Sequence, residues 1–120
     1  MAGQVGFNKD FSKQVGTTVI DVDSVNPNNA IRIGAIAMLN TTAGNAYLQI
    51  FKTAAVNVTL GTTVPDDVIG LPASGGISFP VMSGGWYPGG AGFSIAGTTT
   101  RTGSTVALID VFIIHGRYAV

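Results

Sequence analysis

The chain contains no Gly- and Pro-free stretch of about a dozen residues in which apolar side chains recur every 3.6 residues. Short segments of alternating or continuous apolar character recur instead, and clusters of Gly, Pro, Asn and Ser separate them. Glu is absent, and the β-branched residues Thr, Val and Ile, whose stiff side chains suit a pleated sheet, are abundant. The sequence therefore predicts an all-β chain.

The pattern predicts roughly seven to nine short strands separated by turns. Residues 14–23 alternate in polarity, residues 31–40 are apolar on both faces, and residues 46–53 alternate again. Thr42-Ala43-Gly44-Asn45 is typical of a hairpin turn, so the strands on either side of it are expected to pair. The further strand candidates are residues 56–60, 64–71, 77–81, 92–97 and 106–117. Many short strands at this spacing are typical of a β-sandwich or a jelly roll.

The length of 120 residues fits one domain. We expect residues 14–120 to form a single antiparallel β-sandwich of jelly-roll-like architecture. Residues 1–13 fit no strand pattern well, since Phe7 and Phe11 are spaced among Asn, Lys, Asp and Ser. These residues are interpreted as an extended N-terminal arm.

Charged residues make up only 10% of the chain, against about 25% in an average soluble domain. Six basic residues balance six Asp, which argues against the clustered positive charge of a nucleic-acid-binding surface. No apolar run approaches the roughly 20 residues of a membrane span, and the N-terminus lacks the pattern of a signal peptide. We expect neither nucleic acid nor membrane as a partner. A surface with so little charge indicates that protein neighbours cover part of it.

Residues capable of chemistry are few and scattered. His115 is the only histidine and ends an apolar segment, while the absence of Cys excludes disulfides and thiolate metal sites. Asp21 and Asp23 alternate along one segment, and Asp66 and Asp67 are adjacent. Such pairs could serve glycoside hydrolysis or bind calcium, but a turn in which the carboxylates accept backbone N–H groups is the simpler interpretation of the second pair. We expect no catalytic residue, no metal and no cofactor.

Asp110 interrupts the apolar segment 106–117. A buried unpaired carboxylate is costly, so this side chain either pairs with an arginine or faces solvent. We favour a solvent-exposed position at an edge or an interface.

Aromatic residues provide the candidate contacts with partners. Trp86 and Tyr87 lie in a Gly- and Pro-rich loop over residues 84–90, where they could stack on a sugar, contact another subunit or pack on the protein's own core. Phe7 and Phe11 could anchor the predicted arm on a neighbouring protein. The candidate partner-interface residues are Phe7, Phe11, Trp86 and Tyr87.

Residues 39–114 resemble a β-sandwich module found in small virion proteins of tailed bacteriophages. The matching segments are AYLQIF at 46–51, LPASGG at 71–76, GFSIAG at 92–97 and VALIDVFI at 106–113. Trp86-Tyr87-Pro88 departs from the pattern of the module as an insertion. The resemblance implies a capsid decoration (cement) protein, a head-fibre base or a tail-associated component, and it implies no catalytic residues.

The expected function is therefore that of a structural phage virion protein, a capsid decoration protein that binds the major capsid protein between its subunits. It would be made in the host cytoplasm and sit on the capsid surface, as a homotrimer. The alternative is a carbohydrate-binding or adhesin module displayed on the virion, as a head-fibre or tail component. In that alternative, Trp86 and Tyr87 would form the stacking platform for the sugar.

Overall fold

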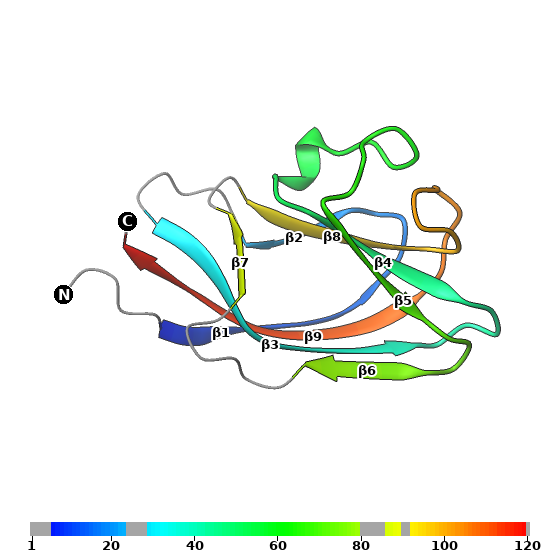
Figure 1. The fold of residues 1–120 in the computed structure, drawn as a ribbon, viewed down its shortest axis with the longest axis horizontal. Helices are drawn as coiled ribbons and strands as arrows, with labels where there is room; N and C mark the ends of the chain where they lie inside the picture. The colour runs from blue at the N-terminus through cyan, green and yellow to red at the C-terminus, as the bar shows by residue number, and fades with distance from the viewer. Residues whose placement is uncertain (1–5, 24–28, 80–85, 90–91, 120) are drawn as a thin grey trace.

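A computed structural model of the chain describes residues 6–23, 29–79, 86–89 and 92–119 (Figure 1). The described strands are β1 (Gly6–Val15), β2 (Ile20–Asp23), β3 (Asn29–Asn40), β4 (Ala46–Phe51), β5 (Asp67–Leu71), β6 (Gly76–Phe79), β7 (Trp86–Gly89), β8 (Phe93–Thr98) and β9 (Ile109–Ala119). One 3-10 turn, Ala55–Asn57, is the only helical element in these ranges. Nothing in the described chain is helical over a length that could span a membrane. The prediction of an all-β chain is confirmed.

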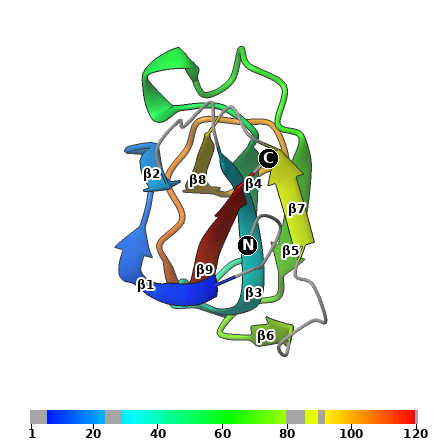
Figure 2. The same cartoon turned by 90° about the vertical axis from the view of Figure 1, so that its left-hand side faces the viewer.

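The strands form two antiparallel sheets that pack as layers (Figures 1 and 2). One sheet has five strands in the order β1-β9-β3-β6, with β7 also pairing with β3. The other has four strands in the order β2-β8-β4-β5. The predicted β-sandwich is therefore confirmed.

The strand pairing follows the jelly-roll pattern. Early strands pair with late strands in reverse order: β1 with β9, β2 with β8, β3 with β6 and β4 with β5. A long antiparallel hairpin that is rolled up gives this set of pairs, and the roll then places β9 beside β3 and β8 beside β4. Strand β7 is an addition to this pattern, inserted between β6 and β8 in the sequence.

The core lies between the two sheets, because alternate residues of each strand point inward. Both layers contribute fully buried side chains to it, the largest being Phe93, Ile33, Leu48, Ile50, Ile95, Ile109 and Ile113. Ile69 of β5 and Ile77 of β6 are partly buried against the core. The sandwich thus closes around one continuous apolar cluster.

The predicted pairing of residues 31–40 with 46–53 is wrong. Strands β3 and β4 follow one another along the chain but belong to different sheets. The buried side chain of Asn40 organises this corner: its Nδ2 donates to the carbonyls of Gly44 (2.7 Å) and Pro72 (2.9 Å). Its Oδ1 accepts from the N–H of Thr42 at 2.9 Å and from the Thr42 hydroxyl at 2.6 Å. The turn therefore carries the chain across the sandwich instead of back along the same sheet.

Four other expectations also need correction. The described part of the predicted arm, residues 6–13, belongs to β1, which pairs with β9 and continues to Val15. The predicted strand 14–23 is divided between β1 and β2 in opposite sheets. Residues 56–60 form no strand, whereas four residues of the predicted loop 84–90 form β7. In each case the pairing partner, which local pattern does not reveal, decides the conformation.

Candidate interaction surface

The side chains of β1, β9, β3 and β6 that point away from the core form a surface that we call the outer face. Directly paired residues run across it in two rows, Ser12–Phe112–Ala37–Ser78 and Gln14–Asp110–Leu39–Gly76. A further row consists of Asp10, Ile114 and Ala35. Alternation along each strand places these residues on one side of the sheet, opposite the buried Ile109, Val111 and Ile113.

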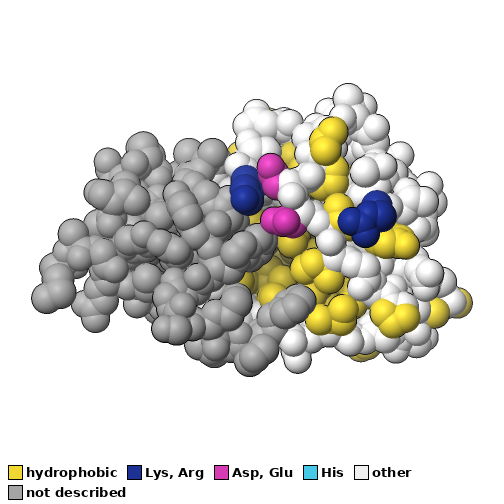
Figure 3. Space-filling model, viewed as in Figure 1, with side chains coloured by type: hydrophobic (Ala, Val, Ile, Leu, Met, Phe, Trp, Pro, Cys, Tyr) yellow, Lys and Arg dark blue, Asp and Glu magenta, His cyan; other side chains and the backbone are white. Residues whose placement is uncertain are grey.

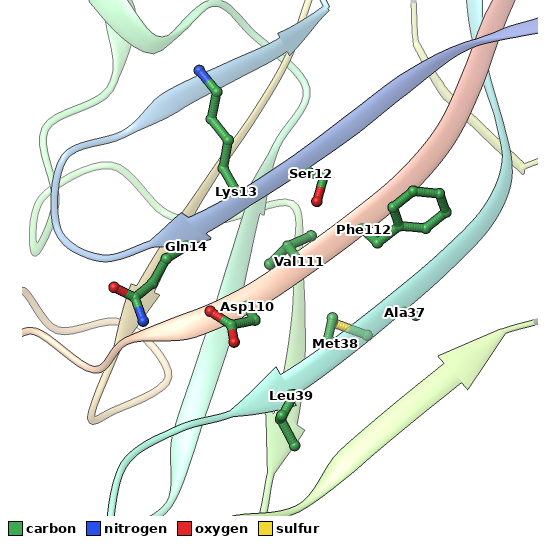
Figure 4. Close-up of a pocket in the computed structure, with 9 residues that line it drawn as sticks. All are labelled: Ser12, Lys13, Gln14, Ala37, Met38, Leu39, Asp110, Val111 and Phe112. Carbon is green, nitrogen blue, oxygen red and sulfur yellow. The ribbon is translucent and has the colours of Figure 1, made fainter.

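Two large apolar side chains stand exposed on the outer face. Phe112 is 41% exposed and Leu39 is 46% exposed. Phe112 lies between the small side chains of Ser12 and Ala37 on the neighbouring strands (Figure 4). A groove of about 530 Å³ runs along β1, β9 and β3 at this position. The outer face is thus an apolar strip with one bulky ring set among small residues.

Charge is scarce on this strip. Within the described rows, the charged side chains are the exposed Asp10 and Asp110. Among the described residues, the face of the molecule seen in Figure 3 shows few charged groups, one basic group beside two acidic groups and another basic group apart from them, among hydrophobic and neutral side chains. Lys13 alternates to the other side of β1, where its Nζ lies 6.0 Å from the centroid of the Phe11 ring. The outer face therefore offers apolar area with two carboxylates, of which Asp110 lies within the strip, between Gln14 and Leu39.

The corresponding face of the four-stranded sheet is covered by the chain itself. Residues 52–66 and 99–105 fold over it, as the loops above β8 and β4 in Figure 1 show. The Ser94 hydroxyl donates to the carbonyl of Thr53 at 2.9 Å. Gln49 Nε2 donates to Thr98 Oγ1 at 2.7 Å and to the carbonyl of Gly103 at 3.0 Å.

Burial follows from these loops. The side chains of Gln49, Ser94 and Thr98 point away from the core, and yet all three are buried. No described loop covers the outer face of the five-stranded sheet in this way (Figure 1). Within the described ranges the two sheets therefore differ, and the five-stranded sheet is the one whose outer apolar surface no described loop covers.

Of the four predicted interface residues, Phe11 is the one whose side chain is described. Phe11 is 7% exposed and belongs to the core, because the alternation of β1 turns it inward together with Val15. It is a core residue and not an anchor on a flexible arm. The side chains of Phe7, Trp86 and Tyr87 lie outside the described residues, although the backbone of Trp86 pairs with Ile33.

The exposed residues Phe112 and Leu39 were missed at the sequence level. The sequence could have indicated the exposure of Phe112, because residues two apart on a strand share a face and Asp110 was expected to face solvent. The expected exposure of Asp110 is confirmed. Its strand is nevertheless not an edge, because β9 lies between β1 and β3.

The remaining polar candidates from the sequence are either buried in a strand or accept hydrogen bonds from backbone N–H groups. His115 is 4% exposed within β9, and Asp66 Oδ2 accepts the N–H of Lys52 at 2.7 Å, as the turn interpretation predicted. Asp21 Oδ1 accepts the N–H of Ala55 at 2.7 Å and so fastens β2 to the loop 52–66. Among the described residues, no three His, Asp, Glu or Cys side chains gather where they could hold a metal ion.

No protein-family model matches the chain, and no curated protein matches its sequence. A solved structure described as "Bacillus endospore appendages form a novel family of disulfide-linked pili" is similar over 100% of this chain and 94% of its own length. The sequence identity is 18% and the TM-score is 0.42. A likeness at this level carries no inference about the function of this chain, which contains no cysteine.

Proposed function

We propose that the protein is a structural component of a bacteriophage virion, a capsid decoration protein that binds the major capsid protein and stabilises the shell. The observation that carries this proposal is the uncovered outer face with its exposed Phe112 and Leu39. The resemblance of residues 39–114 to virion β-sandwich modules supplies the phage context. The low content of charged residues, 10%, agrees with a surface that is partly buried in an assembly.

The mechanism that we propose is burial of the outer face against the shell. Apolar area removed from water contributes about 25 cal/mol per Å². Four strands spaced about 4.8 Å apart make a narrow strip, so a single contact would be weak. Repetition over a closed shell multiplies weak contacts by avidity, and each bound copy that bridges two capsid subunits opposes their separation.

The carbohydrate-binding alternative stays a prediction. It depends on the side chains of Trp86 and Tyr87, which lie outside the described residues. The outer face offers no described aromatic pair in their place, because Phe112 is the single aromatic residue in its rows.

Co-sedimentation with shells assembled from the major capsid protein of the same genome tests the proposal. We expect the wild-type protein to pellet with shells and Phe112→Asp to bind at least about tenfold more weakly, since a carboxylate would be buried in the contact. Val56→Asp is the matched control, because Val56 is 89% exposed on the loop that covers the opposite sheet. A wild-type protein that stays in the supernatant, or a Phe112→Asp variant that binds like wild type, would contradict the proposal.

A further inference from the structure

Strand β1 forms an open edge of the five-stranded sheet. Among the described strands, only β9 pairs with it. In an antiparallel strand, alternate residues turn their N–H and C=O groups away from the neighbour, so an edge presents a row of free donors and acceptors. Strand β1 is ten residues long and contains no proline. It thus lacks two of the usual protections of an edge strand, which are short length and proline.

The regular part of this edge is confined to residues 9–15. The pairing register with β9 shifts between Gly6 and Lys9 and is unbroken from Lys9 to Val15. Within this run, the side chains of Asp10, Ser12, Lys13 and Gln14 are exposed. Even Lys13, which alternates toward the inner side, reaches solvent, because no described strand lies beyond β1.

A second copy of the chain can extend the sheet through a twofold axis that is perpendicular to it. Inward-facing residues of both copies must then lie on the same side of the joined sheet. This requires that one residue of β1, the centre of the register, lies directly opposite the same residue of the second copy, with the axis between the two. In the register centred on Asp10, the Asp10 positions of the two copies face one another. In the register centred on Phe11, the position of Lys9 in one copy is opposite that of Lys13 in the other. A centre at Lys13 opposes that lysine with itself. Each of these registers is disfavoured, because like charges directly opposite one another are destabilising.

The centre at Ser12 differs from those registers in two independent respects. It opposes Lys13 with Phe11 and Asp10 with Gln14, so no like charges face one another, and a lysine faces an aromatic ring. It is also the register that pairs the whole regular run 9–15 with itself. The charges on β1 therefore disfavour the registers centred on Asp10, Phe11 and Lys13. A centre at Gln14 also opposes no like charges, but it pairs only the end of the regular run, so the extent of pairing selects the centre at Ser12.

We infer that two copies of this protein associate edge to edge through β1, in the antiparallel register centred on Ser12. Because the twofold axis is perpendicular to the sheet, the outer faces of both copies lie on the same side. The pair presents a doubled apolar strip, which suits the bivalent contact described under the proposed function. The edge contact itself needs no shell. It is tested on the isolated protein, so its failure can be distinguished from a failure of the proposed function. It predicts a dimer of the isolated protein, whereas the sequence-based expectation is a trimer.

Cysteine scanning measures the register directly, because the chain has no native cysteine. Ser12→Cys places two thiols directly across the axis, where an antiparallel pair has a Cα separation of about 4.5–5.5 Å, within the range that a disulfide spans. Asp10→Cys and Gln14→Cys are matched controls on the same strand and the same face. Each would be about 13 Å along the strand from its own copy in the partner, but directly opposite the other variant.

We therefore expect oxidation or a short bismaleimide to cross-link Ser12→Cys, and to cross-link a mixture of Asp10→Cys and Gln14→Cys. Asp10→Cys alone and Gln14→Cys alone should cross-link far less. Equal cross-linking of all variants, or none in Ser12→Cys and in the mixture, would overturn the inference. So would a wild-type protein whose mass in light scattering stays monomeric up to the highest concentration at which it remains free of aggregates, or whose mass reaches that of a trimer.

Charge substitutions test the same register without cross-linking. Ser12→Lys opposes two lysines across the axis, and we expect the dimer Kd to rise by up to about fivefold. Gln14→Lys faces Asp10 of the second copy, and we expect the Kd to fall by a similar factor. Both side chains are exposed, so the fold is retained. A dimer Kd that rises in both variants, or falls in both, would contradict the register.

Discussion

Replacement of Asn40 by alanine should remove the hydrogen bonds that hold the corner between β3 and β4, where the chain passes from one sheet to the other. The side chain is 1% exposed, and its amide makes four hydrogen bonds of 2.9 Å or less. Two of these reach the carbonyls of Gly44 and Pro72, and two come from the backbone and hydroxyl groups of Thr42. At about 1 kcal/mol for each net hydrogen bond, the free energy of unfolding should fall by about 3–4 kcal/mol.

Urea unfolding followed by circular dichroism measures this loss as a shift of the midpoint at constant slope. Asn57→Ala is the control, because its exposed side chain makes a single 3.2 Å hydrogen bond to Thr53 Oγ1. It should change the free energy of unfolding by no more than about 0.5 kcal/mol. A loss below about 1 kcal/mol in Asn40→Ala would refute the reasoning, since the corner would then be held by something other than this amide.

Two further substitutions probe the core, and a third serves as a control. An alanine Cβ at Gly97 would lie 2.4 Å from the carbonyl oxygen of Ala107 and 2.9 Å from that of Val15, so Gly97→Ala should reduce the thermal midpoint severely or prevent folding. Gly44→Ala, whose Cβ would meet nothing within 4 Å, should leave the midpoint within a few degrees of wild type. Phe11→Ala should lower the free energy of unfolding in urea by about 3 kcal/mol, whereas an unpacked N-terminal arm would give almost no change.

The strand content could be predicted from the sequence because alternation with a period of two is a local property. The sheet to which each strand belongs is not local. Thr42-Ala43-Gly44-Asn45 has the composition of a hairpin turn, but the same residues also suit a corner between sheets. What decides is that the amide of Asn40 contacts Pro72, 32 positions further along the chain. No turn pattern reveals a contact of that separation.

The candidate surface was less accessible to prediction than the fold. Asp110 indicated which residues of β9 face outward, but exposure of Phe112 also requires that no loop lies over it. The loops 52–66 and 99–105 could have covered either sheet, and the structure places them over the four-stranded sheet. Conversely, Phe11 was predicted to lie in an arm because the polar residues around it in the sequence give no alternating pattern that would indicate an inward-facing side of a strand. Tertiary packing, and not residue type, decides that Phe112 is exposed and that Phe11 is buried.

Electron cryomicroscopy of shells decorated with the wild-type protein tests the proposed function most directly. We predict density for the sandwich with the outer face, including Phe112 and Leu39, against the shell, and with the loop 52–66 facing solvent. Shells that carry no additional density after saturation with the protein would contradict the proposal. Density with the opposite orientation, the loop 52–66 against the shell and the outer face exposed, would contradict it as well.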